Sequence, residues 1–130
     1  MAEQEPIDQP TIRTVAMPAD LNPAGDVFGG WLVSQMDLAG GIAAAKRAQG
    51  RIVTTAIDAM VFHQPMKLGD VLSCYCTIEK VGRTSIAIKI EAWAHGRPGG
   101  ESRKITAGRF TYVSVGPDGR PRPVPPEPAA

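Results

Sequence analysis

The chain has 130 residues, of which 43% are hydrophobic and 21% are charged, and its formal net charge is +1. This length is enough for one domain with one core. A charge so near neutral argues against a dedicated nucleic-acid-binding protein, which is usually clearly basic. We therefore expect one globular domain and no nucleic-acid partner.

The N-terminal part of the chain predicts a leader, a short strand and a loop. Residues 1–10 are polar and acidic and contain no apolar stretch of the kind found in signal peptides, so we expect a flexible leader. The domain itself is predicted over residues 11–115. It begins with a β-type run at 11–17, which Pro18 ends, and residues 20–26 (DLNPAGD) are rich in turn formers.

One long helix is predicted over residues 30–49, with Gly50 at its end, where glycine commonly stops a helix. The helix is apolar nearly all round, which predicts burial on most sides. The charge-poor stretch 27–45 is long enough to cross a membrane. It contains Asp37 and four glycines, however, so we interpret it as a buried helix of a protein without membrane contact.

The sequence after the helix has strand character. In the third run, Ile86, Ile88 and Ile90 alternate with polar residues, as expected for a strand with one buried face. The connections are too short for parallel crossovers, so the sheet should be antiparallel. The four predicted strands span residues 52–62, 71–81, 85–95 and 103–115.

The last fifteen residues, 116–130, contain six prolines and predict an extended tail without a role in the core. An antiparallel sheet curled around one apolar helix accommodates all the predicted elements. This α+β arrangement is the hot-dog fold.

The only cysteines, Cys74 and Cys76, lie two residues apart on a predicted strand. This spacing suits neither a structural disulfide nor a zinc site. We expect two ordinary thiols in a cytoplasmic protein, and no bound metal.

Asp37 is the only charge on the apolar part of the predicted helix, and its face carries mostly small residues, including Gly40 and Gly41. A buried carboxylate is costly unless it is paired, so Asp37 has either a structural role at an interface or a catalytic one. Gly29 and Gly30 favour catalysis, because free N–H groups at a helix N-terminus can receive developing negative charge.

Four other polar residues call for an interpretation. Asn22 supplies an amide that could orient a carbonyl or a water. Asp26 either caps the helix or lines the site, and we favour the cap. His63 and His95 lie at predicted strand ends and are expected to be structural or exposed, although dehydratases with a hot-dog fold use a catalytic histidine.

Residues 13–37, RTVAMPADLNPAGDVFGGWLVSQMD, resemble the short-chain acyl-CoA thioesterases of the YciA type. The resemblance continues through residues 53–75 and through 81–93, VGRTSIAIKIEAW, and extends from about residue 11 to 115. The chain departs from the family pattern at Pro23-Ala24 and in the short segment 96–100.

The resemblance implies a hot-dog fold, hydrolysis of acyl-CoA thioesters, and hexamers built as trimers of dimers. It also implies that Asp37 is the catalytic carboxylate and that Asn22 lies across the dimer interface from it, so that two protomers share each active site. The region that contacts coenzyme A is implied to include the turn Gly82, Arg83, Thr84 and Ser85.

Thioester hydrolysis needs an activated water and stabilisation of an oxyanion. Asp37 either acts as the general base or attacks to form a mixed anhydride, and the sequence leaves both routes open. We expect the N–H of Gly30 or Gly29 to hold the thioester oxygen. Arg83 is the best candidate for binding a phosphate of coenzyme A, because its turn presents a guanidinium, hydroxyls and backbone donors together.

Phe28 is included among the predicted substrate contacts, although an aromatic residue there is more often part of a core or an interface. No cofactor is expected, since coenzyme A is part of the substrate and the product. Two other functions stay open: a non-catalytic acyl-CoA or nucleotide sensor, and a hydratase or dehydratase. The second lacks the expected histidine–carboxylate pattern, and a purely structural oligomer leaves Asp37 unexplained.

Overall fold

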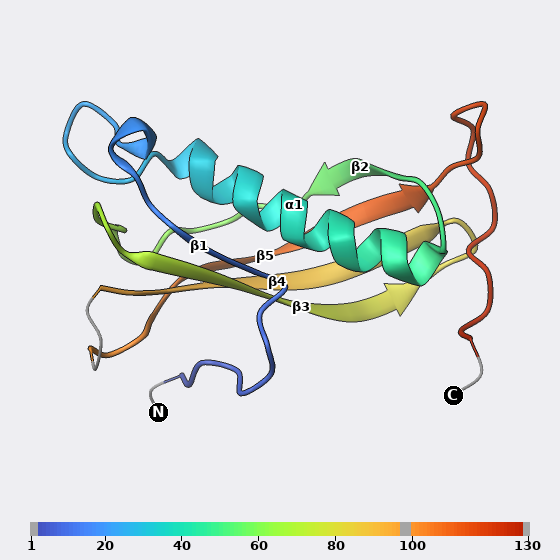
Figure 1. Cartoon of the computed structure of the whole chain (residues 1–130). Helices are drawn as coiled ribbons and strands as arrows, with labels where there is room; N and C mark the ends of the chain where they lie inside the picture. Colours follow the sequence, from blue (N-terminus) through green and yellow to red (C-terminus); the bar gives the residue numbers. More distant parts are fainter. Residues whose placement is uncertain (1–2, 97–99, 129–130) are drawn as a thin grey trace.

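The computed structural model describes residues 3–96 and 100–128, so residues 97–99 of the turn predicted at 96–100 lie outside the described chain. A long helix lies along one face of a curled sheet (Figure 1). The elements are β1 (Ile12–Val15), the 3₁₀-helix η1 (Pro18–Asp20), α1 (Gly29–Ala48), β2 (Ile52–Ile57), β3 (Val71–Val81), β4 (Ser85–His95) and β5 (Arg103–Ser114).

The five strands form one antiparallel sheet in the order β1-β3-β4-β5-β2. The hairpins β3–β4 and β4–β5 make its centre, and β1 and β2 are its edges. The predicted antiparallel hot-dog architecture is therefore confirmed. Because β2 directly follows α1 and pairs with the last strand, it stands beside the helix at an open edge.

The core lies between α1 and the concave face of the sheet. Ile86, Ile88 and Ile90 of β4 are fully buried there, which is the face that the period-two pattern predicts. From the other side the helix contributes side chains such as Leu32 and Met36. Burying these apolar surfaces is the main stabilising contribution to the fold.

The prediction that α1 is buried on most sides is wrong for the single chain. Leu38 and Ile42 of this helix are 57% and 54% exposed. One sheet can cover only one face of a helix. The apolar residues on the outer face are therefore left for contacts beyond this chain.

The predicted strand at 52–62 is shorter in the structure, because β2 ends at Ile57. Its register against β5 shifts between Thr54 and Ala56, and beyond Ile57 only scattered backbone hydrogen bonds continue, such as Asp58 N–H to the Arg109 carbonyl (3.0 Å). The helix differs from its predicted span by one residue at each end.

The C-terminal tail contacts the core, so the prediction that it has no core role is wrong. Val124 packs against the hydrophobic core, and its N–H donates to the carbonyl of Arg83 (2.8 Å). Arg122 donates from Nη2 to the carbonyls of Ala48 (3.2 Å) and Gln49 (3.3 Å) at the end of α1. The prolines keep the tail extended, yet its remaining N–H groups bond along the domain.

The N-terminal leader also touches the sheet, on the face opposite the helix. The Glu3 carboxylate pairs with Lys104 (3.0 Å), and the Tyr75 hydroxyl donates to Glu5. Over the described ranges, no helix has the length and apolar character needed to cross a membrane. Cys74 is buried, Cys76 is half-buried, and both thiols are free.

Candidate active site

The centre of the candidate site is the half-buried carboxylate of Asp37, in the middle of α1. Its Oδ1 accepts hydrogen bonds from the Thr54 hydroxyl of β2 (2.8 Å) and the Tyr112 hydroxyl of β5 (3.0 Å). Among the described residues, no side chain or backbone group donates to Oδ2. One oxygen is thus fixed by two neutral donors, and the other is left for a water or a substrate.

Sheet register explains why these two hydroxyls meet. Thr54 and Tyr112 are direct neighbours across β2 and β5, and Ile86 of β4 pairs with Tyr112 on its other side. Neither Thr54 nor Tyr112 was singled out from the sequence, because they are 17 and 75 residues from Asp37. The signal in the sequence that could have indicated a close contact beside Asp37 was Gly40, which follows Asp37 by one helical turn.

Tyr112 is fully buried and serves as a permanent hydrogen-bond donor. Burial raises the pKa of its phenol well above the usual value, and the negative charge of Asp37 and the hydrogen bond to it raise that pKa further. The hydroxyl therefore keeps its proton throughout the range in which proteins work.

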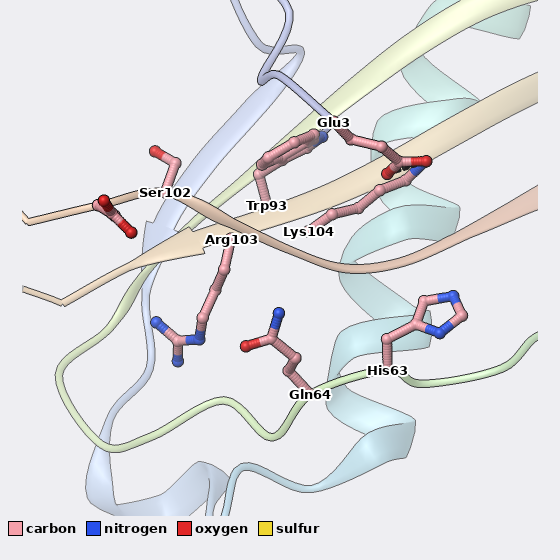
Figure 2. A pocket seen from close by; sticks show the side chains of 8 residues that line it. Glu3, His63, Gln64, Trp93, Ser102, Arg103 and Lys104 are labelled. Carbon is pink, nitrogen blue, oxygen red and sulfur yellow. Dashed lines mark ion pairs between the residues drawn. The ribbon is translucent and has the colours of Figure 1, made fainter. Parts of the chain in front are cut away.

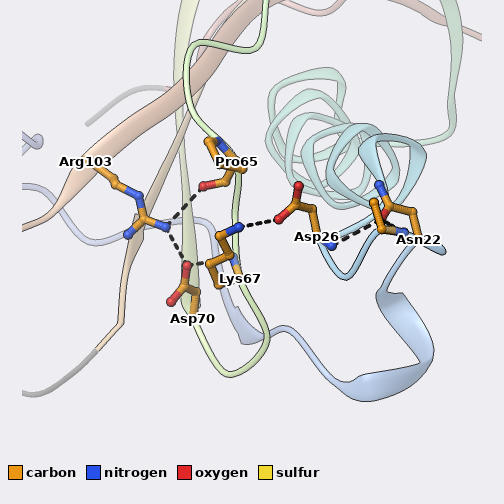
Figure 3. Close-up of polar contacts among 7 residues, drawn as sticks. Asn22, Asp26, Pro65, Lys67, Asp70 and Arg103 are labelled. Carbon is orange, nitrogen blue, oxygen red and sulfur yellow. Dashed lines mark hydrogen bonds and ion pairs between the residues drawn. The ribbon is translucent and has the colours of Figure 1, made fainter.

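Asn22 shapes the loop that leads into α1 (Figure 3). Its Oδ1 accepts the N–H groups of Ala24 (2.9 Å) and Asp26 (3.1 Å), so the acceptor side of the amide is used inside the loop. The Nδ2 group has no acceptor within the described chain, and no hydrogen bond joins Asn22 to Asp37 of the same chain. Its donor side is consequently available to another molecule.

Gly29 and Gly30 are the first two residues of α1, so their N–H groups precede the first intrahelical hydrogen bonds. Phe28 is the N-cap and is 57% exposed, and its ring lies over Gly30, where a Cβ would stand 2.7 Å from Cε1. Gly30 precedes Asp37 by seven residues, or about 10 Å along the helix. The two groups of one chain cannot both touch one carbonyl.

The prediction that Asp26 caps α1 is wrong. The helix has no side-chain cap, and the Asp26 carboxylate instead pairs with the ammonium of Lys67 (Figure 3). Asp26 also forms a backbone bridge with Lys67, so its side chain is turned toward the β2–β3 connection and away from the helix N-terminus.

The Gly82–Ser85 segment forms the tight turn of the β3–β4 hairpin. The Gly82 N–H donates to the Ser85 carbonyl (2.8 Å), the Thr84 carbonyl accepts the Ser114 N–H (2.8 Å), and Arg83 is exposed. Ser85 directly precedes Ile86, the residue paired with Tyr112. The turn therefore lies next to the row of paired residues, Thr54, Tyr112 and Ile86, that supports Asp37.

A pocket of about 590 Å³ lies elsewhere, near the β4–β5 hairpin (Figure 2). Its lining includes neither Asp37 nor the partners Thr54 and Tyr112, and its Lys104 already pairs with Glu3 and with Glu91 (3.6 Å). The candidate site is therefore the surroundings of Asp37 and not this pocket. The pocket is lined by Glu3, His63, Gln64, Trp93, Glu101, Ser102, Arg103 and Lys104.

The two histidines do not come near Asp37's hydrogen-bond partners. His63 is exposed, with its N–H donating to the Ile105 carbonyl (2.9 Å), and His95 is half-buried at the end of β4. Within residues 3–96 and 100–128, no three His, Cys, Asp or Glu side chains gather as a metal site would require.

A curled sheet around one helix, with a carboxylate at mid-helix, defines a hot-dog thioesterase, and the comparisons with known proteins agree. The model of the thioesterase superfamily matches residues 24–100. The acyl-CoA thioester hydrolase YciA of Salmonella typhimurium is 48% identical over 126 residues, which is 95% of each chain. YciA of Escherichia coli is 47% identical and covers 89% of this chain and 90% of its own.

Solved structures give the same result. The hexameric thioesterase y2039 from Yersinia pestis superposes with a TM-score of 0.88 at 47% identity, over 94% of this chain and 99% of its own. The chain belongs to the thioesterase superfamily and, within it, to the acyl-CoA thioester hydrolases of the YciA type.

Proposed function

We propose that this protein hydrolyses acyl-CoA thioesters to a carboxylic acid and coenzyme A, with Asp37 as its catalytic carboxylate. The observation that carries the proposal is the Asp37 side chain itself, with Oδ1 fixed by Thr54 and Tyr112 and Oδ2 open. Family membership supports the substrate class, since the curated relatives are named for acyl-CoA thioester hydrolysis.

Two routes are compatible with this carboxylate. As a general base, Asp37 takes a proton from water while the water oxygen attacks the carbonyl carbon, and the C–S bond then breaks to release coenzyme A as a thiolate that takes up a proton. As a nucleophile, Asp37 displaces the thiolate and forms a mixed anhydride, which water cleaves. A single turnover in oxygen-18 water, with enzyme in excess, distinguishes them: label in Asp37 identifies the anhydride, and label in the acid alone favours the base.

The oxyanion is proposed to bind the N–H of Gly30 or Gly29, where the positive end of the helix dipole adds to the stabilisation. Since Gly30 and Asp37 of one chain are about 10 Å apart along the helix, the two must come from different copies. Asn22, whose Nδ2 donor has no acceptor in the described part of its own chain, then belongs to the copy that supplies Gly30.

Assembly into a homo-oligomer follows from this geometry, and we propose dimers with shared sites that combine into a trimer of dimers. Exposed apolar side chains support it: Leu38 and Ile42 on the helix, and Val53 and Ile57 on the edge strand β2, are each at least 43% exposed in the single chain. The Yersinia relative is described as hexameric.

Sharing of the site can be tested by complementation. Asp37→Asn removes the carboxylate, and Asn22→Asp keeps the loop acceptor while removing the amide donor. Co-expression of the two inactive variants should restore roughly one quarter of wild-type activity, because half of randomly mixed dimers hold one intact site of two. No recovery in confirmed mixed oligomers would refute the shared site.

Coenzyme A is proposed to lie against the Gly82–Ser85 turn, with Arg83 at a phosphate, Thr84 and Ser85 as hydroxyl donors, and Phe28 against the substrate. Coenzyme A enters and leaves with the reaction, and we propose that no further cofactor is needed. The proposed compartment is the cytoplasm.

The deciding assay measures release of coenzyme A from esters of acetyl to palmitoyl length, with wild type, Asp37→Asn and the leader variant Asp8→Asn as the matched control. The thiol reagent needs only a small protein blank, because burial raises the pKa of Cys74 to about 12 and also raises that of Cys76. A loss of at least about a hundredfold in Asp37→Asn alone supports the proposal. No turnover on any chain length, with esters still binding, would refute it and favour a sensor.

A further inference from the structure

Tyr112 has features that packing alone does not require. Its phenol crosses the core from β5 to the helix, and its hydroxyl lies 3.0 Å from Asp37 Oδ1 and 3.2 Å from the Asp37 carbonyl oxygen. A hydroxyl has one proton to donate. The carboxylate oxygen is the closer and the charged acceptor, so the proton belongs there.

Gly40 makes this approach possible. A Cβ at position 40 would lie 2.1 Å from the Tyr112 hydroxyl oxygen and 2.6 Å from Ile90 Cδ1, so any side chain would displace the phenol. Glycine inside a helix is otherwise unfavourable compared with alanine. The neighbouring Gly41 has no such requirement, because a Cβ there would meet only Ile52 Cδ1, at 3.7 Å.

We infer that Tyr112 and Gly40 together form a positioning device for the proposed catalytic carboxylate. The inference rests on the function proposed above. Tyr112 holds Oδ1 on the side of the sheet, which turns Oδ2 outward as the reacting oxygen, and Gly40 supplies the space that the hydroxyl needs. Tyr112 does not touch the substrate, so its effect on the reaction passes through Asp37.

A double-mutant cycle tests this route. Tyr112→Phe keeps the ring and removes the hydroxyl, and in the wild-type background it should lower kcat about 10- to 100-fold with little change in KM, since small misplacements of reacting groups cost up to that much. In the Asp37→Asn background the same change should have almost no effect. A purely structural role would give the same loss in both backgrounds and would overturn the inference.

The glycine pair provides the matched control. Gly40→Ala should lower kcat at least as much as Tyr112→Phe, whereas Gly41→Ala should leave kcat unchanged and raise the melting temperature. Activities are compared per folded oligomer, and if Gly40→Ala fails to fold, the Tyr112 cycle alone decides. If Asp37→Asn abolishes turnover while Tyr112→Phe stays fully active, only the positioning role fails; if Asp37→Asn stays active, the proposed function fails first.

Discussion

Two carboxylates in this molecule are held in opposite ways. Asp70, directly before β3, is buried, and its Oδ2 accepts from Arg103 (2.6 Å) and from the Lys67 N–H (2.9 Å) (Figure 3). Within the part of the chain that the structure describes, the Asp37 side chain is held only by the hydroxyls of Thr54 and Tyr112. A carboxylate paired with a cation and a backbone donor is compensated in charge and has a structural role. Asp37 keeps its charge uncompensated, which suits a group that must react.

The largest effect should come from Asp37→Asn. Loss of the proton acceptor should lower kcat at least about a hundredfold, while the melting temperature stays near or above that of the wild type, because the asparagine oxygen can still accept from both hydroxyls. Thermal unfolding and kinetics on one preparation measure both quantities. A large drop in melting temperature would mean that Asp37 is also structural, and the contrast with Asp70 would weaken.

Asp70→Asn should show the reverse pattern. It removes the charge that compensates Arg103, and we expect a loss of about 2–3 kcal/mol in unfolding free energy, reduced from the value for a fully buried pair because Arg103 is partly exposed. Urea unfolding measures this loss. Turnover per folded molecule should change little, and a hundredfold loss in well-folded protein would contradict our assignment of the site.

A smaller effect is expected at the hairpin turn. Arg83→Ala should raise KM for acyl-CoA about tenfold with kcat nearly unchanged, because a charge-assisted contact to a phosphate contributes to binding in the ground and transition states alike. Arg120→Ala, at another exposed arginine, is the control. Equal effects of both changes would point to general attraction of the anionic substrate and away from a specific contact.

The smallest effect concerns the leader. Burial alone would raise the pKa of Glu5, but hydrogen bonds from Ser102 and Tyr75, with the positive charges of His95 and Arg13, hold that pKa below its usual value. The contribution of Glu5 to folding stability is therefore present above the ordinary glutamate pKa. It is lost as the pH falls through the lower pKa of the folded state.

Loss of the Glu5 contacts should loosen the N-terminal leader from the sheet. Trp93 fluorescence should report this change, because Trp93 lines the same pocket as Glu3 of the leader. A Trp31→Phe background removes the other tryptophan. We expect a change in emission as the pH falls below the ordinary glutamate pKa, and we expect it to be absent in Glu5→Gln, whose contact is already weakened at neutral pH. The same transition in both proteins would assign it to another group.

The sequence predicted the architecture well because each signal was local. Period-two alternation in β4 and the long apolar run of α1 are properties of neighbouring residues, and Asp37 was conspicuous as a single charge among small apolar ones. Its partners were not predictable, because the position of Thr54 beside Tyr112 depends on strand register across the whole sheet.

The errors have the same origin. Asp26 has the sequence position of a helix cap, but Lys67, 41 residues later, takes its carboxylate. The apolar circumference of α1 was interpreted as burial within one chain, whereas Leu38 and Ile42 face outward. A sequence pattern reports that a side chain avoids water, and it does not report which molecule covers it.

Arg122 links the C-terminal tail to the end of α1, which matters for protein engineering. It donates to the last carbonyls of α1, and Gly50 leaves the room it needs, since a Cβ there would lie 2.3 Å from Nη2. A proteolytic cut after residue 115 would therefore remove a cation from the C-terminus of the helix that carries Asp37. Affinity tags and fusion partners should be attached beyond residue 125, where they leave the contacts of Arg122 with the end of the helix intact.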